Sequence, residues 1–134
     1  MSEVGDYLME NYYSKYKGSD MKFLTITQDM VEYALDKHRD RVVVIRDPDI
    51  KGVAVYCTLT DKTYKELDNI NLKDAEMLEV LLEEKGPNIH FILVCGASVK
   101  YILEGIRKVR DRYKAKTVSW WNPTMDYLHK YNMN

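Results

Sequence analysis

The chain has 134 residues, of which 46% are hydrophobic and 31% are charged, and its formal net charge is −1. This length and balance predict one soluble globular domain over residues 1–134, and the near-neutral charge gives no global reason to expect a nucleic acid or a membrane as partner. No apolar run approaches the roughly 20 residues that a membrane-spanning helix needs.

Two helices are predicted at the start of the chain. Ser2 can cap a helix over residues 3–17, which Gly18 ends, and Thr27 can cap a second helix over 28–37. Apolar side chains recur every four residues along the first helix, so we expect this stripe to be buried. Its members are Val4, Leu8, Tyr12 and Tyr16.

A hairpin and a third helix are expected next. Residues 41–46 and 53–60 are rich in β-branched side chains, and the turn-forming residues 47–52 between them predict a hairpin. A helix is then predicted from residue 69 or 71 to residue 85, where Gly86-Pro87 ends it.

The second half of the chain alternates strand and helix. Residues 89–95 form the longest uncharged β-capable run, 98–113 form an amphipathic helix, and 116–122 form another strand. Residues 127–133 suit a short helix or a strand, and the turn-rich bridge over 122–126 favours the strand.

The predicted order is therefore α-α-β-β-α-β-α-β-β. It indicates an α/β fold (α+β mixed) with a mixed sheet and helices on both faces. We expect strand 89–95 to be central, between 53–60 and 116–122, with Leu93 buried.

The turn after the central strand is the candidate binding site. Gly96, Ala97 and Ser98 lead directly into the basic helix. The first N–H groups of a helix lack partners and carry the positive end of its dipole, so this turn can bind an anion.

Other patterns point to chemistry less directly. Residues 98–116 hold seven basic and two acidic residues, with Trp120 and Trp121 nearby. Basic and aromatic residues together can bind a nucleic acid, but we favour the simpler interpretation of a solvated helix face. His38, His90 and His129 are dispersed, without HxxxH or CxxC spacing, so no metal site is predicted.

The two cysteines, Cys57 and Cys95, fall in predicted strands. We expect buried core thiols rather than a disulfide or a nucleophile. Together with an acidic, tyrosine-rich start that is unlike a signal peptide, they favour a cytoplasmic setting.

Over residues 20–133 the element order resembles the GNAT superfamily of N-acyltransferases. It looks closest to the small, divergent GNAT-like proteins of bacteriophages, which carry an extra helix before the central strand and end in a short strand after a sequence like VSWWNP. The resemblance implies that strands 89–95 and 116–122 splay apart, so that the gap admits the pantetheine arm of acetyl-CoA or another acyl-CoA.

The resemblance also assigns roles to residues. Gly96, Ala97 and Ser98 would bind the pyrophosphate through backbone N–H groups, although Leu93 stands where the family turn has Arg or Gln. Lys100, with Arg107, would aid binding of the adenosine phosphate.

The catalytic roles are less complete. Tyr127, which follows Asn122, would be the general acid toward the departing thiolate. No Glu lies in strand 89–95, and His90 could serve as a base if it faces the gap.

Two functions stay open. One is an acyl-CoA-dependent acyltransferase or a descendant that still binds coenzyme A. The other is a non-catalytic GNAT-fold interaction protein, acting on a host or virion component as its protein partner. For the first, we expect Gly96→Val to abolish binding by blocking the phosphates, while Ser98→Ala matters little.

Overall fold

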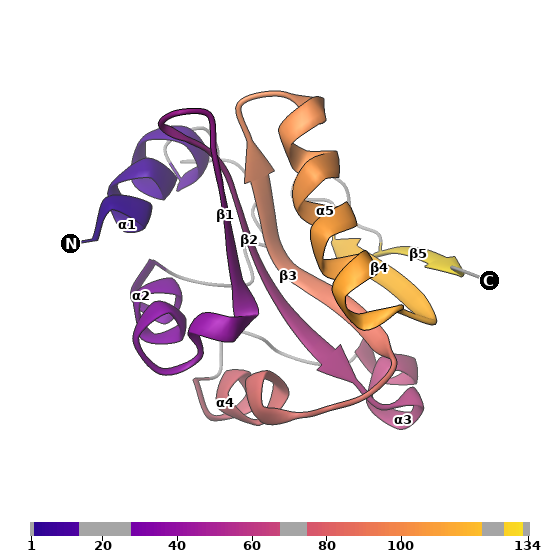
Figure 1. Ribbon diagram of the computed structural model, residues 1–134. Helices are drawn as coiled ribbons and strands as arrows, with labels where there is room; N and C mark the ends of the chain where they lie inside the picture. Colours follow the sequence, from indigo (N-terminus) through magenta and orange to yellow (C-terminus); the bar gives the residue numbers. More distant parts are fainter. Residues whose placement is uncertain (1, 14–27, 68–74, 122–127, 133–134) are drawn as a thin grey trace.

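A five-stranded mixed sheet forms the centre of the molecule (Figure 1). The computed structural model describes residues 2–13, 28–67, 75–121 and 128–132. The strand order is β1-β2-β3-β4-β5, and only the β3–β4 pair is parallel. The strands are β1 (Val42–Arg46), β2 (Ile50–Leu59), β3 (Asn88–Gly96), β4 (Thr117–Trp121) and β5 (Leu128–Asn132). The prediction that residues 89–95 form the central strand, between the other two predicted neighbours, is confirmed.

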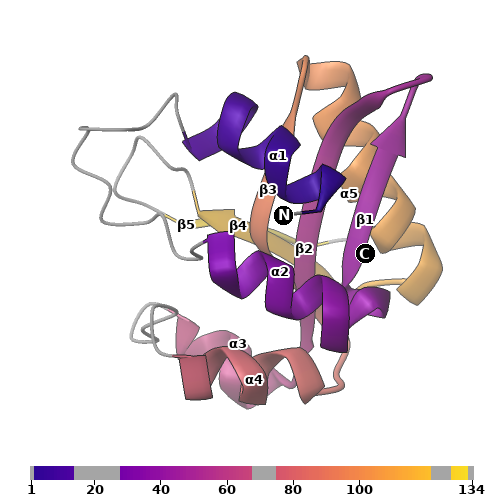
Figure 2. The same ribbon diagram turned by 90° about the vertical axis from the view of Figure 1, so that its left-hand side faces the viewer.

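Helices cover both faces of this sheet, as the sequence predicts (Figures 1 and 2). On one face lie α1 and its π-helical extension η1, α2 and α4, and on the other lies α5. The helices are α1 (Glu3–Leu8), η1 (Met9–Tyr13), α2 (Gln28–Lys37), the 3-10 turn η2 (Arg39–Arg41), α3 (Asp61–Lys65), α4 (Ala75–Glu83) and α5 (Val99–Tyr113).

Coverage on both faces explains the composition of β2 and β3. Nearly every residue of β2 and the first six residues of β3 are buried, so these strands read as continuous apolar runs rather than as alternating ones. Leu93 is 2% exposed and belongs to the cluster under α1, α2 and α4, which confirms its predicted burial. Phe91 and Val109 belong to the cluster under α5.

The first helix follows its predicted stripe as far as the structure describes it. Val4, Leu8 and Tyr12 are buried, and Ser2 caps the helix because its hydroxyl accepts the Gly5 N–H at 2.9 Å. Tyr16 lies outside the described residues.

The sequence prediction missed one helix, α3, which makes the observed order α-α-β-β-α-α-β-α-β-β. The helix has five residues, none of them buried, and it is capped by Thr60. A helix that buries nothing leaves no apolar period to detect. Among the described residues, no helix is both long and apolar enough to cross a membrane.

Candidate functional site

Strand β4 lies beside only the first part of β3, because it ends at Trp121, one residue after its last pair with β3. Pairing between them runs from Asn88–Thr117 to Phe91–Trp120, whereas β3 stays paired with β2 as far as Gly96. Figure 1 shows β3 curving past the end of β4. Burial falls in the same direction, from a fully enclosed start of β3 to a half-buried end. Among the described residues, β3 therefore continues beyond β4 to the turn that the sequence singles out.

That turn places the N-terminus of α5 at the surface. Ala97, Ser98 and Lys100 are exposed, and Val99, the first helical residue, is 69% exposed. Ser98 adopts an extended backbone as the N-cap, but its hydroxyl makes no capping hydrogen bond. Its carbonyl accepts the N–H groups of Tyr101 and Ile102. The first N–H groups of α5 are thus left for another acceptor.

One N–H of the turn is already in use. Ala97 donates its backbone N–H to the carbonyl of Lys51 in β2, at 2.8 Å. The anion-binding capacity of the turn therefore lies at Ser98 and Val99 rather than across all three residues of the predicted site.

The sequence suggests that position 96 is glycine so that phosphates can approach, but the structure shows a packing requirement there. A Cβ at this position would lie 3.1 Å from both Cγ1 and the backbone nitrogen of Ile102, and 3.2 Å from the Cβ of Tyr101. The missing side chain thus makes room for the first turn of α5. Gly96→Val would push that helix away, so it tests packing as much as access for a phosphate.

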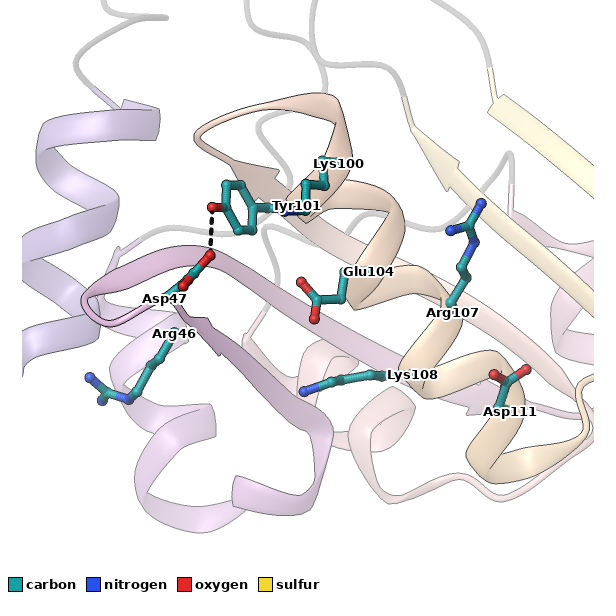
Figure 3. A pocket seen from close by; sticks show the side chains of 8 residues that line it. All are labelled: Arg46, Asp47, Lys100, Tyr101, Glu104, Arg107, Lys108 and Asp111. Atoms are coloured by element: carbon teal, nitrogen blue, oxygen red, sulfur yellow. Dashed lines mark hydrogen bonds between the residues drawn. The ribbon is translucent and has the colours of Figure 1, made fainter.

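An open hollow of about 590 Å³ lies beside this turn, between α5 and the β1–β2 hairpin (Figure 3). Lys100 and Arg107, which the sequence pairs as phosphate-binding residues, both line it. Tyr101 bridges its two walls by donating its hydroxyl to Asp47 at 3.0 Å, a hydrogen bond that raises the pKa of the phenol. The other lining residues are Arg46, Glu104, Lys108 and Asp111.

The basic side chains of the hollow do not converge on one point. Arg46 turns toward α1, where it donates to both carboxylate oxygens of Glu3 at 2.7 and 3.4 Å. In Figure 3 the guanidinium of Arg107 points away from the side where Arg46 lies. With three acidic residues on the same lining, the hollow is not by itself an anion site.

His90 lies in the core and cannot act as a base on an external substrate. It is 0% exposed, and its Nδ1 lies 2.9 Å from the hydroxyl of Ser119 on β4. Burial, with a smaller effect of the Lys130 charge, lowers its pKa to about 3. The suggestion that His90 is catalytic is therefore corrected: its side chain joins β3 to β4 inside the core.

The remaining predicted catalytic residues are not placed. Tyr127 and Asn122 lie outside the described residues. Cys57 is not a candidate nucleophile, since it is buried and burial raises the pKa of its thiol. Cys95 is half-buried near the end of β3, and no disulfide joins the two cysteines.

A smaller hollow of about 220 Å³ lies between α5 and the strands β4 and β5. It brings Trp120 next to Arg107 and Arg110, part of the basic and aromatic pattern noted in the sequence. Trp120 stacks on Tyr131, with ring centroids 5.1 Å apart. Tyr101 belongs to the larger hollow instead, so the described aromatic residues do not form one platform.

The structure also brings together side chains that sequence reasoning did not connect. His38 follows α2, and its Nε2 lies 3.0 Å from a carboxylate oxygen of Glu79 on α4. Glu83 is the third member of this group. His38 and Glu79 are 41 residues apart in the sequence, so no motif of fixed short spacing could have connected them.

Comparison with known proteins adds no family to this description. No family model matches the chain, and no curated protein matches it.

Proposed function

We propose that the protein binds coenzyme A or an acyl-CoA in the manner of the GNAT proteins that its sequence resembles. The observation that carries this proposal is that, among the described residues, β3 continues past its last pair with β4, Phe91–Trp120, and leads into the exposed N-terminus of α5. An extended pantetheine arm would lie beside the second part of β3, and the pyrophosphate would accept hydrogen bonds from the N–H groups of Ser98 and Val99.

The charge around the turn supports the same ligand. Lys100 stands in the first turn of α5, so its ammonium group adds to the positive end of the helix dipole. No acidic residue lies in that first turn. A doubly charged phosphate group is therefore favoured there over a neutral ligand.

Whether the bound acyl group is transferred is a separate question. Tyr127 stays our proposed general acid, and the enclosed His90 supplies no base. This burial favours the second candidate function, a non-catalytic protein of the same fold that acts on a host or virion component. For both candidates we propose a reducing, cytoplasmic setting, which the absence of a disulfide between the two cysteines supports.

Isothermal titration with coenzyme A tests the proposal, using a variant that removes one hydrogen-bond donor and leaves the helix intact. Val99→Pro is such a variant, because proline is well tolerated at the first helical position and lacks the N–H. The extended backbone of Ser98 suits a residue that precedes proline. Val99→Ala is the matched control, since it shortens the same side chain but keeps the donor.

We expect Val99→Pro to raise Kd by about 10-fold to 100-fold, the cost of losing one hydrogen bond to a charged phosphate. Val99→Ala should bind like the wild type. Pantetheine, which lacks the pyrophosphate, should show no difference between the two variants. If the wild type shows no detectable binding of coenzyme A at millimolar concentration, the proposal is overturned. The second candidate function, a non-catalytic interaction protein, then remains.

A further inference from the structure

Helices α2 and α4 lie on the sheet face opposite α5 (Figure 2) and bring together three side chains of types that can ligate a metal ion. His38 comes from the end of α2, and Glu79 and Glu83 come from successive turns of α4. One ligand atom from each lies within 4.8 Å of the others. Residues four apart on a helix share one face, so both carboxylates are presented to the imidazole.

The spacing of these atoms suits a small cation. Bonds of about 2.0–2.2 Å to a zinc-like ion place neighbouring ligand atoms roughly 3 Å apart. His38 Nε2 and Glu79 Oε1 are 3.0 Å apart already. Glu83 is exposed, so its side chain can close the remaining distance by a change of rotamer.

A further contact orients the central carboxylate. Tyr33 of α2 donates its hydroxyl to Oε2 of Glu79, the oxygen that His38 does not contact. Hydrogen bonds of this kind from outside the ligand set hold metal-binding carboxylates in place. Glu79 is thereby fixed with one oxygen turned toward His38.

The ion-pair partner that the described residues give Glu79 is His38, which belongs to the group itself. Among the described residues, no lysine or arginine forms an ion pair with Glu79 or Glu83, and the nearby Lys37 pairs with Asp36 at 3.7 Å. The group also lies at the C-terminal end of α2, where the helix dipole favours a positive charge.

We propose that His38, Glu79 and Glu83 bind a divalent transition-metal ion of the zinc type, with water in the remaining position. One imidazole and two carboxylates are ligands that Zn²⁺ and Co²⁺ accept in tetrahedral sites. The ion would join α2 to α4 across a segment of chain that separates them by more than thirty residues.

Titration of the full chain with Co²⁺ tests this site, because tetrahedral cobalt has visible absorption bands that report its ligands. The background for all samples is Cys95→Ser, so that the half-buried thiol does not contribute a ligand. Glu83→Gln is the informative variant, since this side chain is exposed and its replacement should leave the fold intact. Glu76→Gln, on the same helix but outside the group, is its matched control.

We expect Glu83→Gln and His38→Gln each to weaken Co²⁺ binding at least about tenfold, with Glu76→Gln unchanged. Zn²⁺ should compete for the site and raise the Tm of the control but not of Glu83→Gln. Circular dichroism of each metal-free variant confirms that it is folded. Equal Co²⁺ affinity in Glu83→Gln and in the control would overturn the site, and no binding at millimolar metal would leave the group as a hydrogen-bonded ion pair only.

Discussion

The imidazole of His90 and the hydroxyl of Ser119 meet at 2.9 Å between the two parallel strands of the sheet. The residues are register partners, one on β3 and one on β4. Two positions earlier, Thr117 donates its hydroxyl to the side-chain carbonyl of Asn88 at 2.7 Å. These buried hydrogen bonds join β3 to β4 along the part of β3 that the two strands share.

This arrangement predicts a pH dependence of stability. Burial lowers the pKa of His90 to about 3, whereas a histidine in the unfolded chain has a pKa of about 6.5. Between these values the unfolded chain binds a proton that the folded chain does not, so stability falls as the pH falls. From pH 7 to pH 5 we expect a loss of about 2 kcal/mol from this residue.

Urea unfolding of wild type and His90→Asn at the two pH values measures that loss. Asparagine keeps a polar group near Ser119 but does not titrate in this range. The free energy of unfolding of His90→Asn should therefore depend less on pH than that of the wild type, by about the 2 kcal/mol stated above. The same pH dependence in both proteins would show that His90 is not the responsible group.

Leu93 gives a prediction about the core. Its side chain is 2% exposed and packs on the sheet face covered by α1, α2 and α4. Leu93→Ala should lower the free energy of unfolding by about 2–5 kcal/mol, through lost burial and the cavity that remains. Leu103→Ala, at a position 40% exposed on α5, should cost much less. A loss under about 1 kcal/mol for Leu93→Ala would contradict the packing described here.

The sequence predicts the central elements well because their signals are physical and local. The ends of α5 that its amphipathic period predicts differ from the observed ends by at most one residue. The ends of β3 that its apolar run predicts each differ by one residue. Such patterns arise directly from burial on one or both faces. The preceding helix, predicted to run to residue 85, ends two residues earlier, at Glu83.

The chemistry of the candidate sites is harder to read from sequence because it depends on direction and on distant neighbours. The side chain of His90 points into the core, and the pattern of β3 gives no sign of this. The sequence suggests that Gly96 lets a ligand approach the backbone. In the structure, Ile102 occupies the place next to it, where a side chain would lie. His38 and Glu79 meet only because α2 and α4 pack on the same sheet face.

A buried arginine gives the next prediction. Arg41 is 5% exposed and donates to the hydroxyl of Tyr113 at 3.1 Å and to the carbonyls of Leu82 and Glu84 at 3.3 and 3.4 Å. These carbonyls belong to the C-terminal end of α4, so the guanidinium caps that helix. A lysine cannot direct donors to all three acceptors at once.

We therefore expect Arg41→Lys to lower the free energy of unfolding by about 1–3 kcal/mol, the cost of losing hydrogen bonds from a charged donor at a buried position. Arg39→Lys, an exposed position in the same 3-10 turn, should change it by less than about 0.5 kcal/mol. Urea unfolding of the two variants decides the matter, and equal losses would mean that the contacts of Arg41 contribute nothing specific.

Two glycines should respond to the same substitution with opposite signs. A Cβ on Gly86 would lie 2.1 Å from the carbonyl oxygen of Leu59, so Gly86→Ala must displace backbone. Gly105 lies inside α5, and a Cβ there would meet only the Cβ of Ala54, at 3.9 Å. Alanine stabilises a helix interior relative to glycine by roughly 0.5–1 kcal/mol when it fits without strain.

We expect Gly105→Ala to raise the free energy of unfolding by about that amount, and Gly86→Ala to lower it by about 1–3 kcal/mol through overpacking. Thermal and urea unfolding of both variants under one set of conditions gives the comparison. Because each change adds a single methyl group, a difference in sign must come from the surroundings of the two glycines. A stabilised Gly86→Ala variant would show that the chain does not pass so close to Leu59 at the end of β2.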